Sequence, residues 1–65
     1  MTLLPRYRRY GENDYVGVIS VRLAHAPYIK DEIILGGKSH RTSESALAQA
    51  RSHIETIELV HKLSN

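Results

Sequence analysis

The stretch that decides the fold is Thr42 to Leu63, TSESALAQARSHIETIELVHKL. Its apolar residues recur at steps of three and four, which places them on one stripe of an α-helix; they are Ala46, Leu47, Ala50, Ile54, Ile57 and Val60. Thr42 can cap this helix, because its hydroxyl accepts a backbone N–H that has no partner in the first turn. One helix cannot bury its own stripe, so the preceding residues must form the other wall of the core.

Tyr15 to Leu23 is the strongest candidate strand before this helix, because it is rich in β-branched residues. Its alternation favours an outward face that ends in Arg22, made of Val16, Val18, Ser20 and Arg22, and a core face made of Tyr15, Ile19, Val21 and Leu23. Gly17 inside this strand indicates a bulge or the close approach of another backbone.

Two further strands are predicted on either side of it. Arg6 to Tyr10 suits a short edge strand, and Tyr28 to Leu35 suits a third strand. In the third strand the alternation places Ile29, Ile33 and Leu35 inward and Tyr28, Lys30, Glu32 and Ile34 outward. Asp31 breaks this alternation, so we expect a bulge or a late strand start near Glu32.

The order strand, strand, strand, helix with short connections predicts an α+β domain, in which an antiparallel β-meander packs against one C-terminal helix. We expect residues 1–65 to form this single domain, with a flexible arm at 1–5, a three-stranded sheet at 6–35 and the helix at 42–63.

The composition limits the class of protein. The chain has 65 residues, no cysteine and a net charge of +2. The absence of cysteine excludes disulfides and thiolate metal sites and favours the cytoplasm. No stretch is long enough to span a membrane. A core this small stabilises a fold weakly, so a homodimer or a bound partner is expected to complete it.

No enzymatic chemistry is indicated by the sequence. No serine, histidine and acid stand at motif spacing, so no catalytic residue is assigned. Gly36-Gly37-Lys38-Ser39 lacks the upstream glycine of a phosphate-binding loop. His53 and His61 are two helical turns apart, too far to share one ion. We therefore predict no metal site and no cofactor.

The best functional signal is the basic and tyrosine-containing stretch Arg6 to Tyr10, RYRRY. Arginines can bind phosphates or base edges, and a sheet face can enter the major groove of DNA. The predicted nucleic-acid-binding residues are Arg6, Arg8, Arg9, Arg22 and Lys30, with Lys38 and Arg41 as phosphate contacts. The alternative interpretation of this stretch is an edge strand protected by solvated charges.

A second hypothesis rests on apolar residues that a monomer leaves uncovered. Leu59 and Leu63 project from the side of the helix opposite Ile57, and the outward face of the sheet carries apolar residues as well. The predicted protein interface is Val16, Val18, Ile34, Leu59 and Leu63. The alternative is that Leu3 and Leu4 fold back over one of these patches.

From Tyr15 onwards, the strand end Ile33 to Gly36 and the capped segment Arg41 to Ala50 resemble two kinds of DNA-binding domain. These are the sheet-plus-helix domain of plant AP2 proteins and the N-terminal domain of lambda-type integrases. The resemblance implies DNA binding through the sheet, with the helix behind it. HicB-like antitoxin domains are similar to the same strand meander and Thr-capped helix, and this second resemblance implies a protein partner.

The sequence thus predicts a small non-enzymatic binding protein. The leading hypothesis is a DNA-binding accessory or regulatory protein of phage or mobile-element type. The alternative is a protein-binding module or inhibitor, such as a HicB-like antitoxin or a phage-encoded inhibitor of a host protein, that acts through its sheet face or edge.

Overall fold

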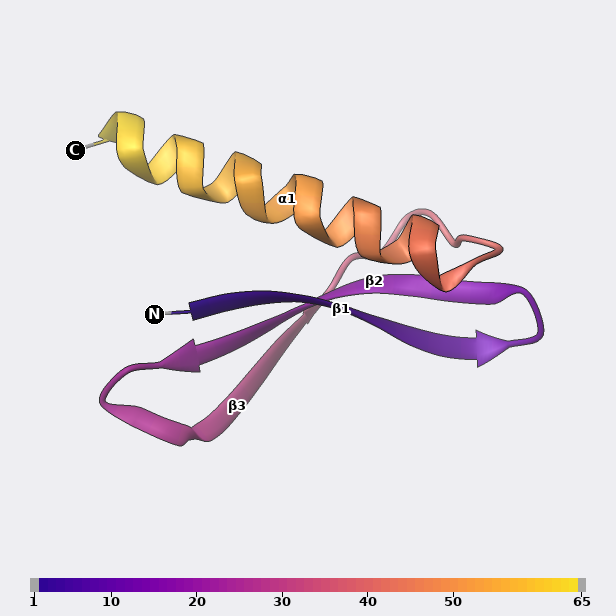
Figure 1. The fold of residues 1–65 in the computed structure, drawn as a ribbon, viewed down its shortest axis with the longest axis horizontal. Coiled ribbons are helices and arrows are strands. Elements are labelled where there is room, and N and C mark those ends of the chain that lie inside the picture. The colour runs from indigo at the N-terminus through magenta and orange to yellow at the C-terminus, as the bar shows by residue number, and fades with distance from the viewer. Residues whose placement is uncertain (1, 65) are drawn as a thin grey trace.

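The computed structural model describes residues 2–64, apart from the side chains of residues 27, 29 and 64. The strands β1 (Thr2–Gly11), β2 (Asp14–Leu23) and β3 (Ala26–Ile34) form one antiparallel sheet in the order β1-β2-β3. The helix α1 (Ser43–Ser64) follows and lies along one side of the sheet (Figure 1). The predicted β-β-β-α fold of the α+β class is confirmed.

The strand β1 begins earlier than the sequence predicted. Residues 2–5 pair with residues 19–22 of β2, with Thr2 opposite Arg22 and Pro5 opposite Ile19. The prediction of a flexible arm at 1–5 is therefore wrong for residues 2–5, while residue 1 lies outside the described residues. The arm is a strand because Leu3 packs against the core beneath α1.

The ladder between β2 and β3 contains an irregularity. Arg22 pairs with Lys30 and Leu23 pairs with Ala26, so residues 27–29 have no partner on β2. A bulge was expected near Glu32, and the irregular segment ends just before Lys30. The regular part of the pairing runs from Lys30 to Ile34.

The connection from β3 to α1 is fastened to the start of β2. Tyr15 and His40 exchange two backbone hydrogen bonds of 2.7 Å each. The His40 ring also lies 2.7 Å, from Nε2 to Oε1, from Gln49 on α1. Thr42 caps the helix, because its Oγ1 accepts the backbone N–H of Ser45 at 3.2 Å.

The core lies between α1 and the first two strands. Ile19, Leu35, Ala50 and Ile54 form its buried cluster, with Leu3, Val21 and Ile57 packed around them. Ile19 and Val21 thus face the helix, as the alternation of β2 predicted. Tyr15 and Leu23, also predicted for the core, are half-buried.

Gly17 lets the helix approach the sheet closely. A Cβ atom at this position would lie 2.9 Å from the carbonyl oxygen of Ala46 and 3.1 Å from Oε1 of Gln49. Any side chain would therefore collide with the first turns of α1. Of the two roles predicted for Gly17, the close approach of a backbone is the one observed.

The helix covers only part of the sheet. Among the described residues, α1 contacts β1 and β2 but not β3. Ile33, predicted to point into the core, is therefore 46% exposed. Val60, predicted for the apolar stripe, is 57% exposed.

The contact at Gly17 gives a direct test of this packing. We expect Gly17→Ala to reduce the free energy of unfolding by about 1–3 kcal/mol, because the added methyl group forces α1 away from β2. Gly36→Ala is the matched control, since a Cβ there meets nothing within 4 Å. Urea denaturation followed by circular dichroism measures both, and equal stabilities of the two variants would contradict the close contact.

Candidate nucleic-acid interface

One face of the sheet is turned away from α1, and it is called the open face below. Because Ile19 and Val21 face the helix, the alternating residues of β2, Val18, Ser20 and Arg22, point to the open face. The register brings side chains of the flanking strands beside them, since residues directly opposite lie on the same side of a sheet. Those side chains are Arg6 and Arg8 from β1 and Lys30, Glu32 and Ile34 from β3.

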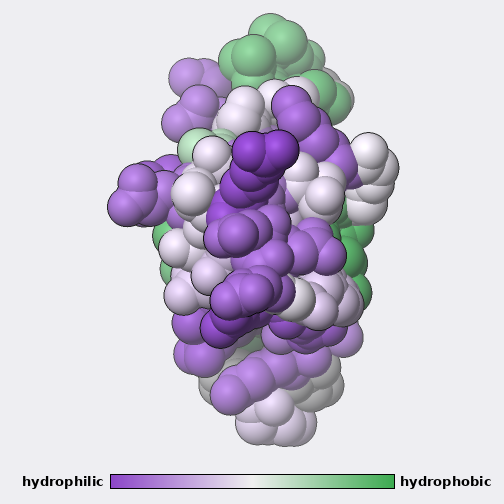
Figure 2. Space-filling model, turned by 90° about the vertical axis from the view of Figure 1, so that its right-hand side faces the viewer, coloured by the Kyte–Doolittle hydropathy of each residue, from purple (hydrophilic) through white to green (hydrophobic). Residues whose placement is uncertain are grey.

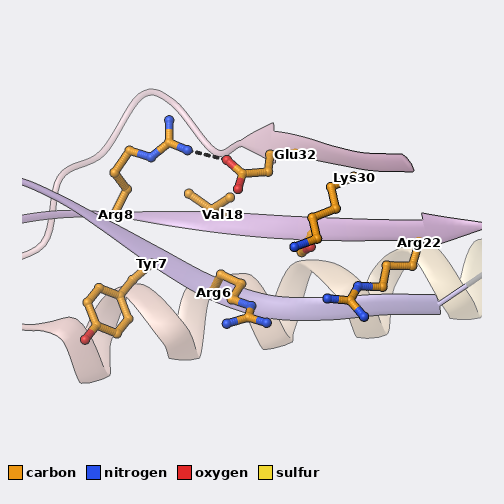
Figure 3. A pocket seen from close by; sticks show the side chains of 8 residues that line it. Arg6, Tyr7, Arg8, Val18, Arg22, Lys30 and Glu32 are labelled. Atoms are coloured by element: carbon orange, nitrogen blue, oxygen red, sulfur yellow. Dashed lines mark hydrogen bonds and ion pairs between the residues drawn. The ribbon is translucent and has the colours of Figure 1, made fainter. Parts of the chain in front are cut away.

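A hollow of about 260 Å³ lies on the open face (Figure 3). Its lining comes from all three strands and consists of Arg6, Tyr7, Arg8, Val18, Ser20, Arg22, Lys30 and Glu32. Four of these side chains are cationic and one is anionic. The sequence predicted Arg22 and Lys30 on one face with the arginines of the first strand, and the fold brings these groups to one hollow.

An ion pair spans the sheet at one end of this hollow. Arg8 donates from Nη2 to Oε2 of Glu32, so that β1 and β3 are joined above Val18 on β2 (Figure 3). The two side chains are 44% and 46% exposed, so the pair itself adds little stability. Their aliphatic stems can nevertheless shield the strand below them. Val18 accordingly keeps only 2% of its surface exposed, although it lies on the open face.

At the other end of the hollow, the charged ends of Arg6, Arg22 and Lys30 gather beside one another (Figure 3). Within residues 2–64, no carboxylate forms an ion pair with any of the three. Nε of Arg22 is buried and has no hydrogen-bond partner. A buried N–H without an acceptor is costly, so the lining of the hollow contains one hydrogen-bond donor that the protein leaves unsatisfied.

Three of the predicted nucleic-acid-binding residues lie away from the hollow. Arg9 pairs with Tyr15, on the side of the sheet that faces α1, and its Nε donates to the carbonyl of Gly11 at 3.0 Å. Lys38 and Arg41 are exposed in the connection before α1. The structure therefore brings together Arg6, Arg8, Arg22 and Lys30 and leaves these three apart.

Three lining residues were absent from the predicted sites, namely Tyr7, Ser20 and Glu32, although the alternation of the third strand had placed Glu32 outward. Ser20 is 8% exposed and places a hydroxyl on the floor of the hollow; its position on the predicted outward face, beside Arg22, was the available signal. Tyr7 also lines the hollow, and its ring contacts that of Tyr15 edge-on, with centroids 5.7 Å apart. Tyr7 lies opposite Gly17, so by alternation its side chain belongs to the side of the sheet that faces α1, and the sequence alone did not fix that register.

The predicted protein interface is divided by the fold. Val18 is buried and Val16 is half-buried, whereas Ile34, the third residue of that surface on the sheet, is 47% exposed. Leu59 and Leu63 are 57% and 77% exposed. Figure 2 shows hydrophobic atoms at the top of the molecule, at the height of the C-terminal end of α1 in Figure 1.

Residues 2–64 contain no group of three or more histidine, cysteine, aspartate or glutamate side chains placed to hold a metal ion. In the described part of the chain, no helix has the length and apolarity needed to cross a membrane.

Comparison with protein-family models, with curated proteins and with solved structures finds no match to this chain. The functional interpretation therefore rests on the residues of the open face.

The burial of Val18 leads to a test of the open face. We expect Val18→Asp to unfold the domain, because the substitution desolvates a carboxylate at a position only 2% exposed, a cost that the neighbouring Arg6 does not offset, and a core of this size supplies about 3–5 kcal/mol. Ile34→Asp is the matched control, since Ile34 pairs with Val18 but is 47% exposed. Thermal melting followed by circular dichroism distinguishes them, and a folded Val18→Asp variant would show that the open face does not bury this residue.

Proposed function

We propose that this protein binds nucleic acid, and DNA in particular, through the open face of its sheet. The observation that carries the proposal is the convergence of Arg6, Arg22 and Lys30 on one hollow, with no carboxylate paired to any of them among the described residues. Phosphate groups of a nucleic-acid backbone supply a negative charge and hydrogen-bond acceptors for these three cations.

The shape of the face supports this choice of ligand. The cationic groups are spread over three adjacent strands, whose spacing is about 4.8 Å, so they follow a line of charge rather than enclosing one small molecule. The hollow is lined by side chains of all three strands, and α1 lies on the far side of the sheet (Figure 3), so an extended polyanion can lie across it. The resemblance to AP2 and integrase domains implies the same use of the sheet.

The ion pair between Arg8 and Glu32 lowers the contribution of Arg8 to phosphate binding on the open face. Glu32 neutralises Arg8 in the free protein and, within residues 2–64, is the one acidic residue that lines the hollow. A phosphate that competes for Arg8 must displace this carboxylate, so Arg8 contributes less to affinity than the three unpaired cations. We infer that the protein is a DNA-binding accessory or regulatory protein in which phosphate contacts provide most of the affinity.

The exposed end of α1 supports a second function, the binding of a protein partner. Leu59, Val60 and Leu63 are each more than half exposed, and a hollow of about 330 Å³ lined by Leu3, Ile57, Glu58 and His61 adjoins them. Exposed apolar clusters of this kind mark interaction sites. This surface lies on α1 and the start of β1, so the two functions do not exclude one another.

The salt dependence of DNA binding tests the proposed function. We expect the affinity for a short fluorescent duplex to fall linearly with the logarithm of salt concentration, and Arg6→Ala, Arg22→Ala and Lys30→Ala each to lower the magnitude of that slope by about 0.9. Fluorescence anisotropy over a salt series measures the slope, and two unrelated duplex sequences should give the same change.

Arg51→Ala is the charge-matched control, because Arg51 is an exposed residue of α1 on the other side of the sheet. The proposal fails if the Arg51 variant loses as much of the slope as the three open-face variants do. It also fails if binding is insensitive to salt.

The role of Glu32 is tested separately. We expect Glu32→Gln to strengthen DNA binding at low salt and to raise the magnitude of the slope by about 0.9, because the substitution releases Arg8 to contact a phosphate. Glu55→Gln on α1 removes the same charge at an exposed position away from the hollow and serves as control. Unchanged or weaker binding by Glu32→Gln would show that Arg8 and Glu32 lie outside the contact.

A further inference from the structure

The two edges of the sheet differ in their ability to accept another strand. Leu35 donates its backbone N–H to Gly17 at 2.9 Å, so Gly17 and the other odd-numbered residues of β2 direct their backbone groups toward β3. The even-numbered residues of β2 therefore direct their backbone groups toward β1. Pro5 lies opposite Ile19, an odd-numbered residue of β2, so the backbone groups of Pro5 point to the outer edge of the sheet. Proline has no N–H to donate, and this protects the outer edge of β1.

The outer edge of β3 has no such protection in its regular part. By the same alternation, Lys30, Glu32 and Ile34 direct their backbone groups away from β2. Among the described residues, no other strand and no helix packs against this edge. Large apolar side chains are exposed along it, with Tyr28 at 81%, Ile33 at 46% and Ile34 at 47%. An edge with these properties favours pairing with another strand.

The sequence of β3 is complementary to itself when it is read in the opposite direction. From Tyr28 to Ile34 it reads YIKDEII, with apolar residues at both ends and Lys30 and Glu32 on either side of Asp31. If Asp31 lies on a two-fold axis, Lys30 of each copy falls opposite Glu32 of the other. In the same register Tyr28 falls opposite Ile34. Opposite charges and aromatic–β-branched pairs both stabilise an antiparallel pair of strands.

We propose that two copies of this protein associate through the outer edges of their β3 strands, in the antiparallel register centred on Asp31. The backbone groups support this register, because Lys30 and Glu32 are the outward-directed residues and would exchange the hydrogen bonds of the pair. A shift by two residues in either direction would place Lys30 opposite Lys30 or Glu32 opposite Glu32. The one unfavourable contact is between the two Asp31 carboxylates.

The association has a geometric consequence for the open face. The two-fold axis of an antiparallel strand pair is perpendicular to the sheet, so both helices lie on one side and both open faces on the other. The result is a continuous six-stranded sheet, in which Arg6 and Arg22 occur twice and each Lys30 lies opposite Glu32 of the other copy. The inference does not depend on what the open face binds.

Charge reversal tests the proposal without DNA. We expect the wild-type protein to be a concentration-dependent dimer in sedimentation equilibrium. Lys30→Glu and Glu32→Lys should each raise the dissociation constant about tenfold, because each variant turns two attractive pairs into repulsive ones. The double variant, Lys30→Glu with Glu32→Lys, should restore the dimer, and Asp31→Asn should tighten it.

Two controls make the result decisive. Glu55→Lys on α1 should leave the dissociation constant unchanged, and circular dichroism should report the same helix content for all variants. A protein that stays monomeric at every concentration overturns the proposal, as does a double variant that stays as weak as the single ones. A dimer that Leu63→Asp dissociates, and that the β3 variants leave intact, would place the contact at the end of α1 and would also overturn it.

Discussion

The close contact between Gly17 on β2 and the first turns of α1 is the constraint on which the rest of the structure depends. Only a glycine leaves room for the carbonyl of Ala46, which would lie 2.9 Å from a Cβ atom at this position. Small residues continue this contact along the helix, because Ala46 and Ala50 are fully buried. The helix is thereby held close to β1 and β2, and Ile19 and Ile54 fill the core beneath it.

This placement of the helix determines what the remaining surfaces can do. Because α1 takes up one side of the sheet, Arg6, Arg22 and Lys30 gather on the other side, where no carboxylate of the described residues forms an ion pair with them. The floor of that side is nevertheless well covered, since the paired side chains of Arg8 and Glu32 extend above Val18. In this 65-residue chain, long charged side chains thus cover the side of the sheet that α1 leaves open, and the same side chains form a cationic surface.

The sequence was sufficient to predict the order of the elements and the cap at Thr42, because these depend on local chemistry and on periodicity. For Gly17 it left two roles open, a bulge or a close approach of another backbone. The strand at residues 2–5 could not be predicted, since its formation depends on Leu3 packing beneath a helix some fifty residues later. The exposure of Ile33 was not predicted. Alternation indicates on which face of the sheet a side chain lies, but it does not indicate how many strands one helix covers. The burial of Val18 depends on an ion pair between residues 24 positions apart, which no local pattern indicates.

The measurement that tests the central claim most directly is a backbone amide NMR titration of the labelled protein with a short DNA duplex. The account predicts that the amides of Arg6, Ser20, Arg22 and Lys30 shift with increasing DNA, while those along α1 change little. Perturbations confined to the exposed C-terminal end of α1 would contradict it, as would a spectrum that does not change at low salt. Either result would mean that the cationic hollow is not the surface that the protein uses.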